Sequence, residues 1–247
     1  MNLKKTAAVC FAAALLSACA GGTQTTSSDA AAQPAETTAE TTTMALPEGG
    51  VLNFDPPKKG DKIGIIKVKD YGEIKFKLFP EAAPLACENF EGLCSQNYYD
   101  ELIFHRIIPQ FMIQGGDPKG TGKGGQSMWG GSFDGGIPEG LYHFSGAVAY
   151  ANSGSTSTNG SQFYIVNTDI GYIYGNDIES YGYPQEVADL YREHGGTPFL
   201  DGRYTVFGQV FEGYEYVQQI AQVETDDSDK PLKQVQMESV RVVEYDG

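Results

Sequence analysis

The chain has little cysteine, little histidine and a deficit of positive charge. Its 247 residues include four cysteines and three histidines, and the histidines lie too far apart in the sequence to suggest a metal site. With 17 Lys and Arg against 32 Asp and Glu, the net charge is −15, which argues against nucleic-acid binding and against electrostatic binding to anionic lipid. We therefore predict no metal and no nucleic-acid partner.

A long hydrophobic run is also missing at the N-terminus. Lys4 and Lys5 precede an apolar run over residues 7–16, and small residues follow it. This is the layout of a secretory signal, and the run is too short to cross a bilayer as a helix. We predict a signal peptide over residues 1–18. Its removal changes the net charge from −15 to −17, because two lysines and no acid leave with it.

The end of this signal reads Leu16-Ser17-Ala18-Cys19, which resembles a bacterial lipobox. The resemblance implies that Cys19 receives a diacylglyceryl group, carries acyl chains such as palmitate, and becomes the new N-terminus. Two or three acyl chains give stable anchoring. We expect a protein anchored outside the cytoplasm, at the outer face of the cell membrane or on its periplasmic side. Ordinary secretion with cleavage near Ala20 is the alternative.

Residues 19–50 form the next segment, rich in Thr, Ala, Ser, Gln and Gly. Such a composition cannot bury enough apolar surface to offset the entropy of ordering, so we predict a disordered tether. A flexible coil of this length spans on the order of 30 Å. The remaining residues 51–247 are expected to form one domain.

Two of the four cysteines lie in this domain. Cys87 and Cys94 fall on one face of a predicted helix over residues 84–96, separated by about 10 Å along its axis. A disulfide needs Cα atoms within about 7 Å, so we predict two unpaired thiols in the core.

The domain pattern is that of a single all-β barrel closed by helices. Short strand signals recur between turns rich in Gly, Pro, Asp and Asn. They cover residues 62–69, 72–78, 112–115, 145–150, 163–167, 206–211 and 235–244. Amphipathic patterns predict helices over 84–96 and about 214–223, which would cover the ends of the barrel.

An insertion between Thr168 and Thr197 adds a short helix. The helix is predicted over residues 184–194, with Pro184 at its start and two glycines after its end. Four tyrosines precede it, at positions 172, 174, 181 and 183. They either pack the insertion or form an added rim for binding polypeptide.

Two stretches carry most of the functional information, residues 104–117 and 159–165. Both alternate apolar and polar residues as a strand of a closed sheet does. The first places Arg106 and Gln114 near the bulky side chains of Phe111 and Met112. A guanidinium beside an apolar slot is costly in a core and useful in a binding site.

With these stretches the chain resembles the cyclophilins, the cyclosporin-binding family of peptidyl-prolyl isomerases, from about Asp61 to Asp246. The resemblance implies a closed eight-stranded antiparallel barrel capped by two helices. It also implies rotation about X–Pro bonds, whose barrier is ~18–20 kcal/mol. Millisecond turnover needs about 5 kcal/mol of differential stabilisation. An apolar pocket for the proline ring and a donor to the prolyl nitrogen can supply it, without nucleophile, metal or cofactor.

The resemblance also implies a role for each site residue. Arg106 would be the donor to the twisting amide, and Gln114 would hold the arginine in place. Phe111, Met112, Tyr164, Phe199 and Leu200 would line the proline pocket, whereas Ala151, Asn152, Gln162 and Tyr204 would contact or border the substrate chain. Arg106 as a structural ion-pair partner is the alternative. The neighbouring His105 is expected to be a core or hydrogen-bonding residue, since no proton transfer is needed.

Some positions depart from the best-known animal members of the family. Phe199 stands where those members have Trp, so an indole N–H is missing and weaker cyclosporin binding is implied. Tyr164 stands in place of Phe, and its hydroxyl must find a partner. Tyr204 stands in place of His, and the loop over residues 153–158 is one residue longer than the common form.

The predicted function is thus a tethered isomerase that assists folding of exported proteins. Its partners would be proline-containing, unfolded or partly folded polypeptides, and nothing in the sequence demands more than a monomer. A tethered module that binds proline segments with little turnover is the main alternative. A solute-binding lipoprotein is disfavoured, because it usually needs a larger two-lobed body. The glycine-rich stretch 120–125 lacks the spacing of a phosphate loop.

Overall fold

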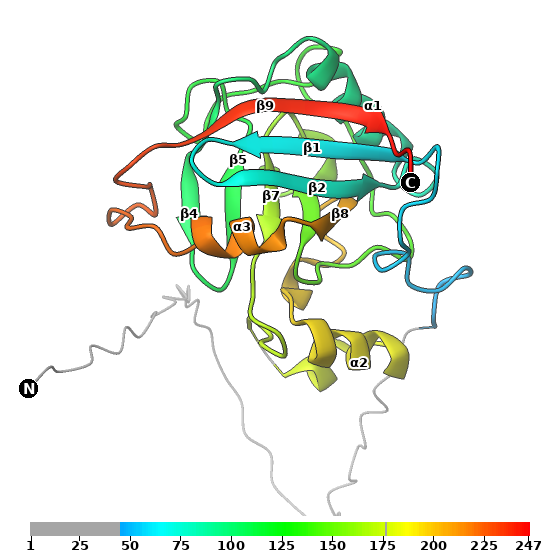
Figure 1. Cartoon of the computed structure of the whole chain (residues 1–247). Coiled ribbons are helices and arrows are strands. Elements are labelled where there is room, and N and C mark those ends of the chain that lie inside the picture. The colour runs from blue at the N-terminus through cyan, green and yellow to red at the C-terminus, as the bar shows by residue number, and fades with distance from the viewer. Residues whose placement is uncertain (1–44, 176) are drawn as a thin grey trace, which may run out of the picture. The chain divides into compact units, whose positions relative to one another are not determined.

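The computed structural model describes residues 45–175 and 177–247. The predicted signal peptide, Cys19 and most of the predicted tether lie outside the described residues. The described part forms a sheet wrapped into a barrel, with helices packed against it (Figure 1). Among these described residues, no helix has the length and apolarity that a bilayer crossing needs.

Nine strands form one antiparallel sheet. They are β1 (Lys62–Val68), β2 (Gly72–Leu78), β3 (Ile103–Phe104), β4 (Arg106–Ile108), β5 (Met112–Gly115), β6 (Ala147–Tyr150), β7 (Phe163–Val166), β8 (Val206–Glu212) and β9 (Val235–Glu244). Their order in the sheet is β3-β9-β1-β2-β8-β6-β7-β5-β4. The strands predicted from the sequence are confirmed to within about two residues at their ends.

The two outermost strands of the sheet are nearly consecutive in the sequence. β3 and β4 are the outermost strands, and only His105 separates them in the sequence. The His105 N–H donates to the Gln114 carbonyl at 3.0 Å, so the chain crosses from one end of the sheet to the other at this residue. The predicted antiparallel barrel is therefore confirmed. It has nine segments instead of eight because one stretch pairs with β9 before this crossing and with β5 after it.

Three α-helices accompany the barrel within the described residues: α1 (Pro84–Ser95), α2 (Gln185–His194) and α3 (Tyr214–Ile220). Proline begins α1, where its missing N–H costs no hydrogen bond. Phe90 of α1 and Val217 of α3 are fully buried in the same core as the strands. The prediction for α3 was too long, because the chain leaves the helix after Ile220 in tight turns.

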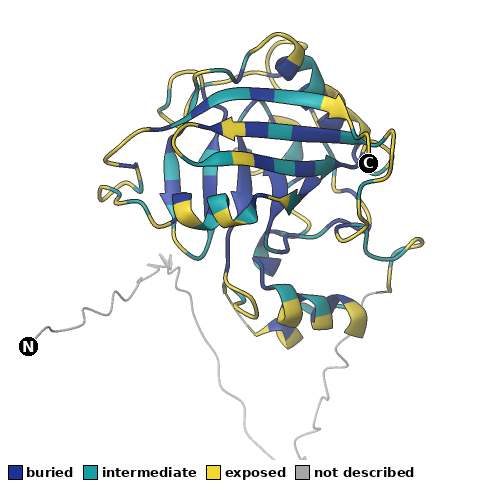
Figure 2. Cartoon of the chain, in the orientation of Figure 1, coloured by how far each residue is buried: buried dark blue, intermediate teal, exposed yellow. Residues whose placement is uncertain are grey.

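The strands near the site are buried on both faces, and alternate residues enter different clusters. Along β7, Phe163 and Ile165 join the barrel interior, whereas Tyr164 and Val166 join a second cluster outside it. Figure 2 shows this double burial as dark blue over the strands at the centre of the sheet. Because side chains on a strand point alternately to opposite faces, one short strand contributes to both the core and the site.

The insertion has a small core of its own. It contains Ile178, Val187, Ala188 and Tyr191, packed on Phe144 of the barrel domain. The predicted helix in the insertion is confirmed as α2, which Figure 1 draws in yellow.

Both cysteines of α1 are buried and unpaired, as the helical spacing predicted. Burial raises the pKa of the Cys87 thiol to about 12 and raises that of Cys94 as well. These thiols are therefore neutral core residues, and neither is an available nucleophile.

Candidate active site

A row of side chains crosses four strands on the outer face of the barrel. The sheet register aligns Arg106 with Gln114, Gln114 with Tyr164, and Tyr164 with Ala149. Residues that pair directly across strands point to the same face, so the register alone gathers these residues of β4, β5, β7 and β6.

A pocket of about 210 Å³ lies on this row. It is lined by Arg106, Phe111, Met112, Gln114, Ala151, Asn152, Tyr164, Leu200 and Tyr204. Every residue that the sequence assigned to catalysis or substrate binding is in this set, except Gln162 and Phe199. The pocket places apolar side chains such as Phe111, Met112 and Leu200 beside one guanidinium and several polar groups, which suits a small apolar ring attached to a polar amide.

The two remaining residues lie next to the pocket. Gln162 accepts a hydrogen bond from Gln114 at 2.9 Å and donates to the Gly124 carbonyl at 2.8 Å. The Phe199 ring lies 5.7 Å from the ring of Phe111. Tyr174 of the insertion stacks on Phe111 at 4.9 Å, so the insertion touches the wall of the pocket directly.

Arg106 has a different partner from the one expected. Its Nε lies 3.2 Å from Asp229 Oδ2, whereas the Gln114 amide is bonded to Gln162. The residue that holds the arginine is therefore Asp229, in the loop before β9, and not the predicted Gln114. Within the described part of the chain, the terminal nitrogens of Arg106 have no hydrogen-bond partner, and they remain available to a ligand in the pocket.

The Arg106–Asp229 pair is an exposed one. The two side chains are 43% and 42% exposed, and pairs of this kind contribute about 0–1 kcal/mol to stability. Arg106 therefore takes part in an ion pair, as the alternative interpretation held, and also lines the pocket. The weak pair orients the guanidinium and contributes little to folding.

Asn152 uses its side chain to shape the loop beside the pocket. Its Nδ2 donates to the Arg203 carbonyl at 3.0 Å, and its Oδ1 accepts from the Gly154 N–H at 2.9 Å. Its neighbour Ala151 donates its N–H to the Gln162 carbonyl. Among the described residues, the backbone N–H and C=O of Asn152 have no partner, so they are available to an extended substrate chain.

The hydroxyl of Tyr164 does find a partner, behind the pocket. Tyr164 Oη lies 3.0 Å from Nε2 of the buried His143, and His143 Nδ1 lies 2.5 Å from Asp201 Oδ1. Burial raises the pKa of Tyr164 far above its usual value, so its hydroxyl stays protonated. In the neutral tautomer whose Nδ1–H donates to the carboxylate, Nε2 accepts a hydrogen bond from the Tyr164 hydroxyl.

Asp201 is the junction between this chain and the insertion. Its Oδ2 accepts from Tyr183 at 2.7 Å and from Tyr191 at 2.6 Å. The polar chain therefore runs from the floor of the pocket to α2. Neither His143 nor Asp201 was predicted, because their roles depend on contacts with residues 21 and 10 positions away that no local pattern marks.

His105 is a buried residue outside the pocket, as expected. It is 5% exposed, and both ring nitrogens lack a partner among the residues the structure describes. Burial lowers the pKa of His105, so the ring is neutral near pH 7. We therefore assign it no part in the reaction.

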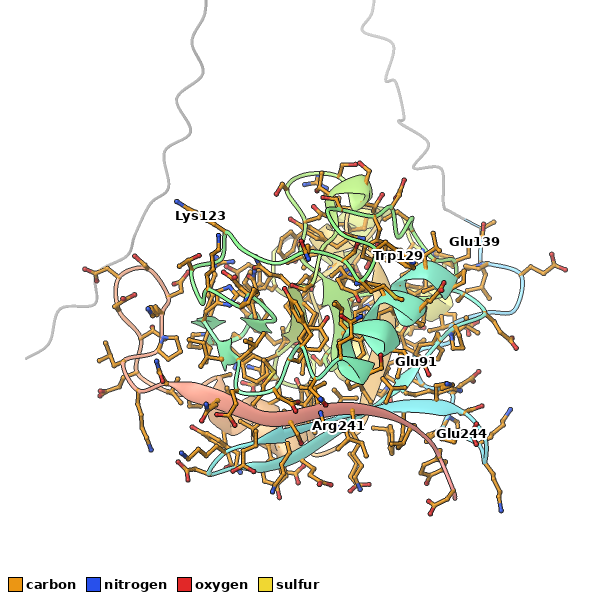
Figure 3. The ribbon with its side chains drawn as sticks, turned by 90° about the horizontal axis from the view of Figure 1, so that it is seen from above. Glu91, Lys123, Trp129, Glu139, Arg241 and Glu244 are labelled. Atoms are coloured by element: carbon orange, nitrogen blue, oxygen red, sulfur yellow. The ribbon has the colours of Figure 1, made fainter. Side chains whose placement is uncertain are left out.

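The glycine-rich loop after β5 is organised by Asp117. The backbone N–H groups of Lys119 and Thr121 donate to its carboxylate at 2.8 and 2.9 Å. Burial opposes ionisation of Asp117, but these hydrogen bonds prevail and lower its pKa. Lys123 extends outward from the loop (Figure 3). The side chain of Asp117, a residue of the loop itself, thus fixes the conformation of the loop.

In the described ranges, no group of three His, Cys, Asp or Glu residues could hold a metal.

The comparisons with known proteins agree with this geometry. A family model described as "Cyclophilin type peptidyl-prolyl cis-trans isomerase/CLD" matches residues 64–242. A Staphylococcus aureus relative, named as a peptidyl-prolyl cis-trans isomerase, is 42% identical over 198 residues, which cover 78% of this chain and 100% of the relative. A Streptococcus pyogenes relative, named as a bifunctional phosphatase/peptidyl-prolyl cis-trans isomerase, is 48% identical over 176 residues, which cover 70% of this chain and 37% of that protein.

Solved structures give the same result. The crystal structure of a Cryptosporidium parvum cyclophilin type peptidyl-prolyl cis-trans isomerase matches with a TM-score of 0.60 and 32% identity, over 75% of this chain and 99% of that one. A structure of the same protein in the presence of the dipeptide Ala-Pro matches with a TM-score of 0.59 and 33% identity, over 74% and 99% of the two chains. By its sequence, its barrel and the row of side chains on it, the chain belongs to the cyclophilin-type peptidyl-prolyl cis-trans isomerases.

Proposed function

We propose that the pocket on the outer face of the barrel catalyses rotation about X–Pro bonds, with Arg106 as the group that lowers the barrier to rotation. The proline ring enters the slot between Phe111, Met112 and Leu200. The guanidinium donates a hydrogen bond to the prolyl nitrogen as amide resonance is lost. That hydrogen bond stabilises the twisted amide more than the planar one, because the nitrogen lone pair is available to accept it only in the twisted form.

The observation that carries this proposal is the position of Arg106. It lines the pocket together with Phe111 and Met112, and its Nε is paired with Asp229 while its terminal nitrogens face no partner within residues 45–175 and 177–247. A pure binding module has no need of a donor aimed at the slot. The competing hypothesis, a proline-binding module with little turnover, requires only the apolar walls.

We further propose that the enzyme works outside the cytoplasm, anchored through a lipid on Cys19, and assists the folding of exported proteins. The signal-like residues 1–18 and the lipobox-like end of that segment support this location. Cyclosporin would bind only weakly, because Phe199 lacks the indole N–H that a Trp would offer at this position. The chain is expected to act as a monomer.

Replacement of Arg106 by Ala tests the catalytic role. We expect kcat/KM for an X–Pro test peptide to fall by about 100-fold, equivalent to about 2.7 kcal/mol, with the melting temperature nearly unchanged. Arg106→Lys should recover only part of the activity, since an ammonium lacks the planar geometry of the guanidinium. A proline module without catalysis would instead show no turnover in the parent chain and proline-peptide binding in both.

Arg192 offers a matched control for this substitution. It is 40% exposed and pairs with Glu179 and Asp189 on the insertion, so its environment resembles that of Arg106 away from the pocket. Arg192→Ala should leave kcat/KM within about twofold. An equal loss in both variants would point to a general effect of surface charge and would contradict the assigned role.

The location is tested by Cys19→Ser. Labelled fatty acid should be incorporated into the parent chain and recovered in the membrane fraction, whereas the variant should carry no label and leave that fraction. Label in both chains, or in neither, would refute lipid attachment at Cys19 without affecting the isomerase proposal.

A further inference from the structure

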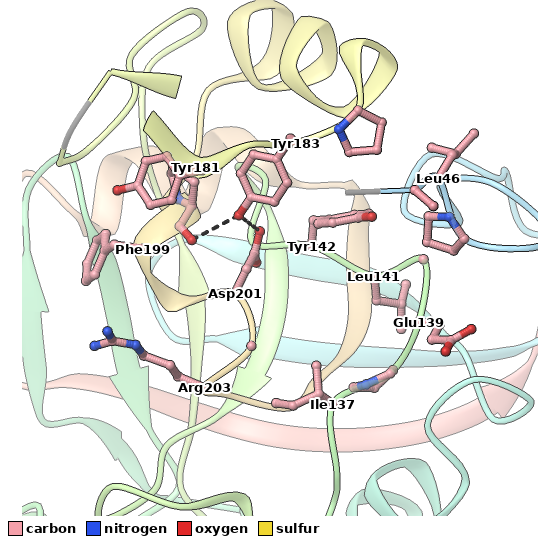
Figure 4. Close-up of a pocket in the computed structure, with 17 residues that line it drawn as sticks. Leu46, Ile137, Glu139, Leu141, Tyr142, Tyr181, Tyr183, Phe199, Asp201 and Arg203 are labelled. Atoms are coloured by element: carbon pink, nitrogen blue, oxygen red, sulfur yellow. Dashed lines mark hydrogen bonds between the residues drawn. The ribbon is translucent and has the colours of Figure 1, made fainter. Parts of the chain in front are cut away.

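A second and larger hollow adjoins the proline pocket. It has a volume of about 630 Å³, against about 210 Å³ for the pocket itself. Figure 4 shows Tyr183 and Tyr142 along one side, Ile137 along the other, Phe199 and Arg203 at one end, and Leu46 at the opposite end. We call this hollow the tyrosine groove.

The tyrosine groove is built before any ligand arrives. The Tyr183 hydroxyl donates to Asp201 at 2.7 Å and lies 3.2 Å from the Pro198 carbonyl, which fixes its ring. The ring of Tyr181 stacks against it at 5.8 Å, and the ring of Tyr142 meets it edge-on at 5.9 Å. Rigid aromatic walls bind a ligand with little further loss of conformational entropy.

The groove also exposes apolar surface. Ile137 is 46% exposed and Leu46 is 39% exposed, and both line it. Single exposed apolar residues are ordinary on a protein surface. Here they share one concave site with three tyrosines, and a concave apolar site with a few polar groups is typical of binding.

The groove and the proline pocket lie on two sides of one chain segment. Phe199 lines the groove, and its ring packs on Phe111 of the pocket. The next residues alternate between the two sites, since Leu200 and Tyr204 line the pocket whereas Asp201 and Arg203 line the groove. One chain segment thus separates the two sites, so a polypeptide bound in the pocket could extend across it into the groove.

We propose that the tyrosine groove is a second subsite for the client polypeptide, which binds an aromatic or large aliphatic side chain a few residues from the isomerised proline. An extended chain advances about 3.3 Å per residue, and the rings of Phe111 and Phe199 lie 5.7 Å apart between the two sites, so a spacing of at least two residues is expected. The inference rests on the proposed function, because the occupant is part of the same substrate. It gives the insertion, which supplies Tyr181 and Tyr183, a role in substrate choice.

Charge disfavours a second copy of this chain as the occupant. The full chain has a net charge of −15, so two copies repel each other. A client chain brings no such fixed charge. Exported polypeptides that are still unfolded also expose the aromatic side chains that the groove would bind. The segment preceding residue 45 is the other candidate, since Ala45 and Leu46 line the groove.

The test uses the full chain and two sets of peptides. One set has a four-residue Ala-Pro core alone. The other set extends that core with a Phe placed two, three or four residues before or after the proline, and with Ser at the same place as the reference. We expect one spacing to lower KM by about tenfold relative to its Ser counterpart, with kcat little changed, because the added contact is the same in ground and transition states.

Ile137→Ser should remove most of this gain while leaving turnover of the four-residue peptide unchanged. Ile170→Ser is the matched control, since Ile170 is 85% exposed and lines none of the pockets described here. It should retain the full gain. A peptide copying residues 25–44 serves as a competitor, and sedimentation velocity reports the oligomeric state.

Three results would overturn the inference. Turnover of the short peptide without any gain from Phe at any spacing would remove the subsite and leave the proposed function intact. Competition by the 25–44 peptide against the extended substrate alone would assign the groove to the chain's own N-terminal segment. A dimer in the parent chain that Ile137→Ser dissociates would assign it to a second copy. Absence of turnover with every peptide would instead refute the proposed function.

Discussion

The two faces of the central strands differ in kind, although the same short segments make both. Inside the barrel, Phe163 meets Phe90 and Tyr99 edge-on, with ring centroids 5.6 and 5.5 Å apart. Outside, the next residue, Tyr164, lies beside an open pocket and is bonded to the buried His143. The inner face is filled mainly by packed rings, whereas the outer face is held by a chain of hydrogen bonds.

The comparison separates stability from function within a single strand. The interior is closed and mostly apolar, so its cohesion comes chiefly from packing and from removal of apolar surface from water. The outer face must remain open to a ligand and so cannot be filled. Its polar groups are fixed from behind by His143, Asp201 and two tyrosines of the insertion. Such a network rigidifies a site without occupying it.

The interior face should give the largest effect on stability. Phe163→Ala removes a fully buried ring from the centre of the barrel and should lower the free energy of unfolding by about 3–5 kcal/mol. Urea unfolding measures the change, and kcat/KM per folded molecule should stay within about twofold.

If that variant does not fold, Phe163→Leu keeps most of the volume and should cost less. A variant that remains stable but loses activity would contradict the division between the two faces.

The neighbouring residue on the outer face should affect stability less and activity more. Tyr164→Phe removes the hydroxyl, leaves Nε2 of His143 without its donor, and should lower stability by about 1–3 kcal/mol. The pocket becomes more apolar, so kcat/KM should rise by about two- to fivefold. A simultaneous loss of activity would show that the hydroxyl contacts substrate and does more than anchor the ring.

The insertion sharpens this test. Tyr183→Phe removes one of the donors to Asp201 without touching the pocket of Arg106. In a double-mutant cycle with Tyr164→Phe, the two effects on stability should be non-additive, because the hydroxyls belong to one hydrogen-bonded chain.

His105, at the crossing between β3 and β4, should give the smallest effect. Burial lowers its pKa in the folded state, whereas the unfolded value is about 6.5. Below that pH the unfolded chain binds the extra proton, so stability falls as pH decreases from about 6.5, by at most ~1.4 kcal/mol per pH unit.

Urea unfolding between pH 7.5 and 5 measures this slope, which His105→Gln should flatten. The carboxylates with lowered pKa, such as Asp117, titrate below this window and do not confuse it. An unchanged slope in the variant would place the titration elsewhere.

Much of the fold could be predicted because local patterns carried it. The strand and helix positions followed from alternation, amphipathic spacing and the proline at the start of α1. The count of strands did not, since β3 and β4 are short and differ only in their partners. The site residues proposed from the resemblance lie in or beside one pocket, whereas the groups behind them were missed. Asp229 is 123 positions from Arg106, and nothing in its acidic loop marks it as a partner.

The sequence by itself determined the strand-forming segments and the side chains available to the site, because backbone preference and the period of two are local properties. Only the tertiary structure decided which residue of each buried strand faces the core and which faces the pocket. The runs 147–150 and 163–166 are apolar at every position, so their sequences do not show which residues face the core. The orientation of 147–150 is set by its pairing with β8, and that of 163–166 by its pairing with β5. The same pairing brought the insertion against Asp201, and so connected a distant helix to the floor of the pocket.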